Sequence, residues 1–188
     1  MFDAFFTSTI AVAIAEIGDK TQLLSLLLAA RYRRPAPIIL GILVATLANH
    51  TVAAALGLWL AELVPATMLQ IAVGVSFLAM AAWALIPDKI DPDTTKRVPD
   101  FGAFIATLML FFLVEIGDKT QIATVALAAR FHSVFAVTLG TTLGMMIANI
   151  PVVIFGEAIT RRLPLSIIRW ITAALFVIFG AAILLAEL

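Results

Sequence analysis

The chain contains one charged stretch twice, and the residue types in it could bind an ion. Glu16-Ile17-Gly18-Asp19-Lys20-Thr21-Gln22 returns 99 residues later as Glu115-Ile116-Gly117-Asp118-Lys119-Thr120-Gln121. Each copy places two carboxylates and a lysine inside a long apolar run. Charged side chains are costly within a membrane and usually mark an ion or substrate pathway. The two copies therefore predict a functional site.

The acids and glutamines of the two copies favour a hard divalent cation. Carboxylate and amide oxygens are the ligands that Ca2+, Mn2+ and Mg2+ prefer. The chain has no cysteine, and its two histidines, His50 and His132, occupy different places, so a softer metal is not indicated. Each copy sums to −1 over its Glu, Asp and Lys, so two copies match one divalent ion. The expected ligands are Glu16, Asp19, Gln22, Glu115, Asp118 and Gln121.

The depth of the acids in the membrane suggests what replaces the cation when it leaves. Glu16 lies roughly 12 residues into its apolar run, or about 18 Å into a core of about 30 Å. Bare carboxylates that are buried and close together are disfavoured, so we expect them to take up protons. A site that holds a cation or protons in turn is the core of a cation/proton exchanger.

The other residues of the motif have structural alternatives. The lysines could neutralise a carboxylate or tune affinity, or they could form a structural ion pair, such as one with Glu16 one turn back. The glutamines could make structural hydrogen bonds, and the threonines could bond back to carbonyls of their own helix. The residues assigned to support the motif are Gly18, Lys20, Thr21, Gly117, Lys119 and Thr120.

A regular helix would not present the whole motif on one face. At about 100° per residue, Asp19 lies near Glu16, whereas Gln22 points about 120° away. Glycine is the residue that would let the helix open. We therefore predict that the helix is bent or opened near Gly18 and Gly117.

Polar side chains elsewhere in the apolar runs could line the pathway or relay protons. Interhelical hydrogen bonding explains them equally well. The candidates are Ser25, Asn49, His50, Thr124 and Asn149.

The composition indicates an all-α membrane protein. Of 188 residues, 63% are hydrophobic and 13% are charged, against about 25% charged in soluble domains. Apolar runs of about 20 residues are long enough for membrane helices. Six runs are expected, at about 4–29, 36–61, 66–86, 101–129, 134–158 and 165–186.

The repeat extends beyond the motif. Residues 16–31 and 115–130 are identical at 11 of 16 positions, and Gly41 and Gly57 align with Gly140 and Gly156. We expect two three-helix repeats, 1–86 and 101–188, joined by a linker at 87–100. An odd number of spans inverts the second repeat, an architecture that places sites at the repeat interface near the midplane.

Basic residues predict the orientation. Loops 31–35, 87–100 and 159–164 share one side and carry eight Lys and Arg residues, whereas the other side has only Arg130. The positive-inside rule places these loops in the cytoplasm and both termini outside.

The paired Glu-x-Gly-Asp-Lys-Thr motifs resemble the Gdt-type family of Ca2+/Mn2+:H+ antiporters. That family includes Golgi glycosylation-linked members and bacterial manganese exporters, and it is grouped with the lysine-exporter superfamily. The resemblance covers nearly the whole chain. It implies that Glu16, Asp19, Glu115 and Asp118 bind the cation. The compact length implies a bacterial-type plasma (inner) membrane protein and manganese efflux.

Two other functions stay open at this point. One is export of a cationic organic solute such as an amino acid, and the other is a membrane-embedded enzyme that uses the paired acids. No catalytic residue and no cofactor is assigned, and the lack of a basic stripe argues against nucleic acid. The expected partners are a divalent ion, protons and the lipid bilayer; a homo-oligomer is compatible with the sequence but not indicated by it.

Overall fold

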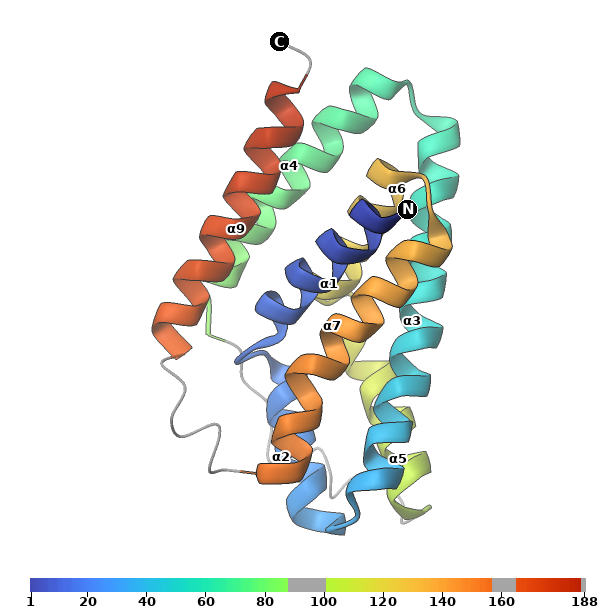
Figure 1. Ribbon diagram of the computed structural model, residues 1–188, viewed down its shortest axis with the longest axis vertical. Coiled ribbons are helices and arrows are strands. Elements are labelled where there is room, and N and C mark those ends of the chain that lie inside the picture. The colour runs from blue at the N-terminus through green and yellow to red at the C-terminus, as the bar shows by residue number, and fades with distance from the viewer. Residues whose placement is uncertain (88–100, 157–164, 187–188) are drawn as a thin grey trace.

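The computed structural model describes residues 1–87, 101–156 and 165–186, and all regular structure in these ranges is helical, as predicted (Figure 1). Most of the expected linker 87–100 and all of the loop 159–164 lie outside the described residues. The helices are α1 (Phe2–Glu16), α2 (Lys20–Tyr32), α3 (Pro35–Leu63), α4 (Ala66–Ala84), α5 (Gly102–Glu115), α6 (Lys119–Phe131), α7 (Val134–Phe155) and α9 (Leu165–Leu185).

Both copies of the motif interrupt a helix. The apolar runs at about 4–29 and 101–129 are each two helices separated by a break. The predicted opening near the glycines is confirmed, because Gly18 has φ 82° and Gly117 has φ 75°. A right-handed helix cannot continue through such a residue, and glycine adopts this conformation without a Cβ clash. The chain resumes a helix at each lysine.

Of the described helices, four are long and apolar enough to cross a membrane: α3, α4, α7 and most of α9. α5 is apolar but shorter, with 14 residues. At 1.5 Å per residue, a helix of this length covers only about 21 Å of a core of about 30 Å. Large apolar side chains such as Leu40, Trp59 and Trp170 are exposed, whereas the four acids of the two motifs are buried. The chain is a multi-pass membrane protein.

Each long helix packs against one interrupted pair: α7 contacts α1 and α2, and α3 contacts α5 and α6. α1 packs along α7, α5 packs along α3, and α4 pairs with α9 at one edge (Figure 1). A methyl group at Gly41 of α3 would lie 2.8 Å from the Cβ of Thr107, and one at Gly140 of α7 would lie 3.0 Å from the Cβ of Ser8. Because Ser8 and Thr107 are also 99 residues apart, the same close contact is made in both halves.

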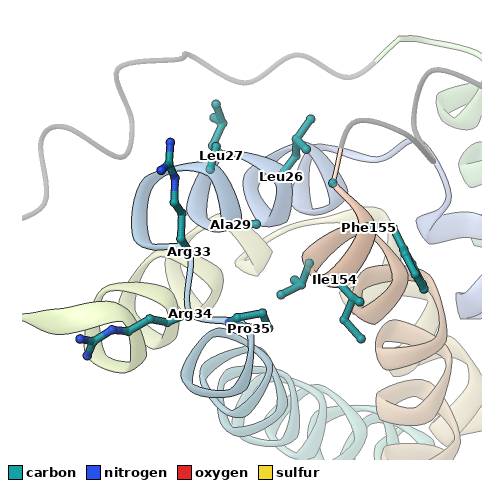
Figure 2. Close-up of a pocket in the computed structure, with 11 residues that line it drawn as sticks. Leu26, Leu27, Ala29, Arg33, Arg34, Pro35, Ile154 and Phe155 are labelled. Atoms are coloured by element: carbon teal, nitrogen blue, oxygen red, sulfur yellow. The ribbon is translucent and has the colours of Figure 1, made fainter.

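One pair of equivalent positions differs between the halves. At Gly57 of α3 an added methyl group would clash with the carbonyl oxygen of Val125, so α6 is tightly packed there. At Gly156, no atom of the described residues would lie within 4 Å of an added methyl group. Instead, a cavity of about 560 Å³ is lined by Leu26, Ala29 and Gly156, between α2 and the end of α7 (Figure 2). Within the part of the chain that the structure describes, α3 and α6 are thus in close contact, whereas a cavity separates α2 from the end of α7.

Candidate functional site

Four helix ends meet where the two motifs meet. Glu16 and Glu115 are the last residues of α1 and α5, and Asp19 and Asp118 are the N-cap residues of α2 and α6. All four acids are at most 1% exposed. Neither aspartate side chain accepts a capping hydrogen bond from its own helix. The carboxylates that meet here therefore come from both halves of the chain.

Three of these acids form a compact oxygen cluster. One carboxylate oxygen from each of Glu16, Asp19 and Asp118 lies within 4.8 Å of the other two. A cation with metal–oxygen distances of about 2.0–2.6 Å can contact oxygens at that separation. The C-terminal ends of α1 and α5 carry partial negative charge and the N-termini of α2 and α6 carry partial positive charge, so the attraction for a cation comes from the acids themselves. The cluster can hold a hard divalent ion.

Several polar atoms in this region have no hydrogen-bond partner among the described residues. They include Oε2 of Glu16, Oε1 of Glu115 and the hydroxyl of Thr21. A buried polar atom without a partner costs about 1–3 kcal/mol or more. Such atoms are retained where a ligand or a proton satisfies them, which is a second indication of a binding site.

Each lysine of the motif forms an ion pair with a residue of the other half of the chain. Lys20 Nζ lies 2.9 Å from Asp118 Oδ1, and Lys119 Nζ lies 2.6 Å from Asp19 Oδ1. The alternative of an ion pair between Lys20 and Glu16 one turn back is wrong, because the helix begins only at Lys20 and Glu16 belongs to the helix before it. Each lysine instead reaches the aspartate of the other motif.

The glutamines hold the helix breaks. The backbone N–H of Gly18 donates to Gln22 Oε1 over 2.8 Å, and that of Gly117 donates to Gln121 Oε1 over 2.7 Å. This contact resembles the capping box, in which the third helical residue reaches back to an orphan N–H. Gln22 is buried and also donates from Nε2 to the carbonyl of Ala148. The structural alternative for the glutamines is therefore realised, and one lone pair of each amide oxygen is left.

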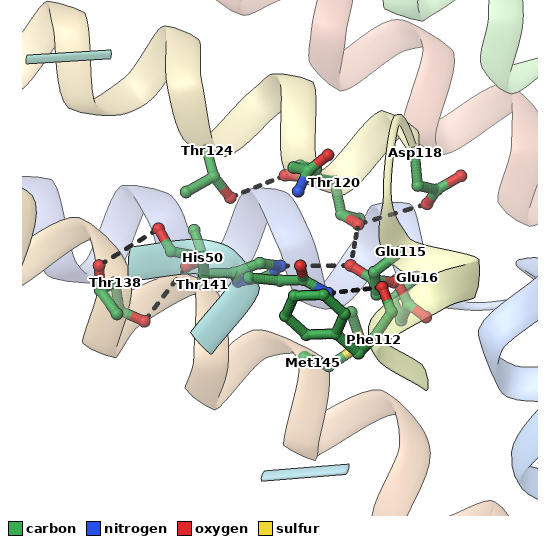
Figure 3. Close-up of polar contacts among 12 residues, drawn as sticks. Glu16, His50, Phe112, Glu115, Asp118, Thr120, Thr124, Thr138, Thr141 and Met145 are labelled. Carbon is green, nitrogen blue, oxygen red and sulfur yellow. Dashed lines mark hydrogen bonds and ion pairs between the residues drawn. The ribbon is translucent and has the colours of Figure 1, made fainter. Parts of the chain in front are cut away.

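The threonines of the two motifs differ in their contacts. The hydroxyl of Thr21 has no hydrogen-bond partner among the described residues. Thr120 donates at 3.3 Å toward Glu115 Oε2 and Asp118 Oδ2 (Figure 3), so its hydroxyl belongs to the acid cluster. Thr124, a candidate pathway residue, donates to the carbonyl of Thr120 within its own helix.

Two candidate pathway residues contact the glutamates. His50 Nε2 lies 3.4 Å from Glu115 Oε2, and Asn149 Nδ2 donates over 3.4 Å to Glu16 Oε1 (Figure 3). Ser25 donates to Asn149 Oδ1 over 2.6 Å, which orients the amide. His50, Asn149 and Ser25 are all buried and form a layer behind the acids.

Asn49 lies outside this layer. Its side chain donates to the carbonyl of Phe112, in the last turn of α5. The helix break leaves such carbonyls without a partner within the helix. Asn49 therefore stabilises the break.

Sequence reasoning did not single out two residues of α9. Arg169 and Thr172 line a cavity of about 10 Å³ together with Asp19 and Lys119. Thr172 also donates to the carbonyl of Ile14 at the end of α1. The available signal was Arg169 itself, the only charged residue within the sixth apolar run.

The comparison with known families shows to which class of protein the chain belongs. The family model described as "Divalent cation/proton antiporter GDT1" matches residues 4–92 and 103–188. The chain belongs to the GDT1 family of divalent cation/proton antiporters. This membership confirms the resemblance seen in the motifs, and it excludes the membrane-embedded enzyme.

Individual relatives agree with the GDT1 assignment. A protein of Vibrio cholerae serotype O1 named "Putative manganese exporter" is 51% identical over 176 residues, covering 93% of this chain and 87% of that protein. GDT1-like protein 4 of Oryza sativa subsp. indica is 28% identical over 206 residues, covering 96% and 72%. A GDT1-like protein of Synechocystis sp. is 28% identical over 200 residues, covering 96% of each chain. No solved structure matches the chain.

Proposed function

We propose that this GDT1 antiporter exports Mn2+ in exchange for protons, and that Glu16, Asp19, Glu115 and Asp118 bind the ion. The observation that carries the proposal is the buried cluster of carboxylate oxygens within 4.8 Å, contributed by both motifs. An antiporter of divalent cations needs such a set of hard oxygen ligands. The choice of Mn2+ over Ca2+ rests on the Vibrio cholerae relative, which is named as a manganese exporter.

Gln22 and Gln121 remain predicted ligands of the cation, but they are secondary to the four carboxylates. Their amide oxygens already accept a hydrogen bond from Gly18 and Gly117. In the proposed site they keep the two breaks open, and the carboxylates supply the charge.

Proton exchange follows from the burial of the acids. Without a cation, several buried carboxylates lie close together, and one oxygen of Glu16 and one of Glu115 have no hydrogen-bond donor among the described residues. Protonation removes the charge and supplies a donor to the site. One cation and the protons therefore exclude each other, which couples their movements in opposite directions.

We further propose six spans in two inverted repeats, with each interrupted pair of helices serving as one span. Reciprocal contacts support this arrangement: Lys20 with Asp118 mirrors Lys119 with Asp19. A two-fold axis that relates the motifs would produce such crossed pairs.

The open cavity suggests which side loads the ion. Arg33 and Arg34 line it together with Gly156 (Figure 2). The positive-inside rule assigns this basic loop to the cytoplasm, with both termini outside, in a bacterial inner membrane. In the proposed cycle, this conformation is open toward the cytoplasm, where an exporter takes up its substrate.

Proton flux in proteoliposomes tests the function. With a pH-sensitive dye inside, an imposed Mn2+ gradient should drive protons in the opposite direction, and Ca2+ and Mg2+ are compared under the same conditions. Asp19→Asn and Asp118→Asn should each abolish this flux while the protein stays folded. Asp3→Asn is the matched control, because Asp3 is exposed. Mn2+ transport with no pH change, or intact flux in either site variant, would contradict the proposal.

A further inference from the structure

The crossed lysines pair with the two aspartate carboxylates that a cation in the cluster would contact. Lys119 lies 2.6 Å from Asp19 Oδ1 and Lys20 lies 2.9 Å from Asp118 Oδ1. The same two aspartates supply oxygens to the cluster within 4.8 Å. An ammonium group and a divalent ion cannot both be in close contact with these oxygens without repelling each other.

The position of the lysines in their helices supports a role beyond packing. Lys20 and Lys119 are the first residues of α2 and α6. A cation is unfavourable at a helix N-terminus, where the backbone carries partial positive charge. The ion pairs with the aspartates must offset this cost, so each lysine is held at the site mainly by a carboxylate that a cation would contact.

The two lysines differ in their freedom to leave. The Lys20 side chain is 24% exposed, whereas that of Lys119 is 5% exposed. Lys20 can swing away from Asp118 without unpacking its surroundings. Lys119 is enclosed beside Asp19, in the half where α6 is packed tightly against α3.

We propose that Lys20 is a tethered competitor of the transported cation: its ammonium group takes the place of the ion at Asp118 and must withdraw for the ion to bind. The inference rests on the proposed function of the same site. It makes Lys20 a determinant of affinity and release, since the returning lysine helps to expel the bound ion. In the mirrored conformation, with the halves exchanged, Lys119 would take the corresponding part at Asp19.

Equilibrium binding of Mn2+ to the purified full chain tests the proposal, with free Mn2+ measured by electron paramagnetic resonance. Lys20→Met keeps the length of the side chain and removes the competitor, so it should bind Mn2+ at least about fivefold more tightly, the value of one ion pair of about 1 kcal/mol. Lys20→Arg retains a cation and should not bind more tightly. Arg31→Met, which removes a charge from the exposed end of α2, should match the wild type.

A second measurement needs no variant. If Mn2+ displaces Lys20, modification of its amine by an amine-reactive reagent, followed by mass spectrometry, should accelerate when Mn2+ is added to the wild type. Unchanged or slower modification, or a Lys20→Met variant that binds Mn2+ equally or less tightly, would overturn the competitor role. If the wild type binds no Mn2+, or if its Mn2+ binding does not depend on Asp118, the proposed function itself would be overturned instead.

Discussion

His50 lies 3.4 Å from Glu115, in the position that Asn149 holds beside Glu16 in the other half. Each glutamate ends a helix that stops inside the protein, and each is met by a side chain from the long helix that crosses it. The pairs are equivalent in place but differ in chemistry, since only one of them contains a ring that can gain or lose a proton.

This equivalence predicts that asparagine can replace His50. His50→Asn should keep a donor beside Glu115, and the free energy of unfolding should change by less than about 1 kcal/mol. His50→Leu should lower it by about 1–3 kcal/mol, because Glu115 already has one oxygen without a partner and would lose another contact. Thermal or denaturant unfolding in detergent measures both variants side by side.

The two variants separate hydrogen bonding from ring chemistry. If His50→Asn is as unstable as His50→Leu, the contact with Glu115 depends on the imidazole itself, and the equivalence with Asn149 is only geometric.

The meeting of the two motifs could be predicted because the sequence contains the same motif twice. The matched copies at Glu16 and Glu115 indicated a site with parts from both halves, and the mismatch of Gln22 with a regular helix indicated the opening at Gly18. These inferences need only helix periodicity and the conformational freedom of glycine.

The partners across the site could not be predicted in the same way. Glu16 lies one turn before Lys20 in the sequence, so a local ion pair between them was one of the alternatives, yet the partner of Lys20 is Asp118. Which carboxylate a lysine reaches depends on how the two helix breaks face each other, and no local pattern encodes that relation. The difference between Gly57 and Gly156 could not be predicted either, because glycine occupies both positions, yet one packs closely against α6 and the other lines a cavity.

The glutamines should stabilise the two breaks unequally. Gln22→Ala removes the acceptor for the Gly18 N–H and also the donor to the Ala148 carbonyl, in a buried place, so it should cost about 2–4 kcal/mol of unfolding free energy. Gln121→Ala removes the equivalent bond to Gly117 where the contact is exposed, and should cost about 1 kcal/mol or less. The free energies of unfolding of the two variants are measured and compared. Equal losses would show that the stabilisation by each glutamine does not depend on the burial of its contact.

The cavity beside α2 makes a last prediction about access. The chain has no cysteine, so single cysteines can be introduced without background. Ala29 lines the cavity, whereas its equivalent Ala128 is fully buried against Gly57. A membrane-impermeant thiol reagent applied from the side of the 31–35 loop should modify Ala29→Cys on the order of tenfold faster than Ala128→Cys, since a buried thiol reacts only when its contact opens.

Adding Gly57→Leu should reverse this order. The leucine cannot fit against the carbonyl of Val125, so α6 must move away from α3. If opening one half closes the other, Ala128→Cys becomes reactive toward reagent from the opposite side, while Ala29→Cys becomes protected. A rise in reactivity at both positions would mean that the leucine merely loosens the protein, and the two halves would then not be coupled as alternating access requires.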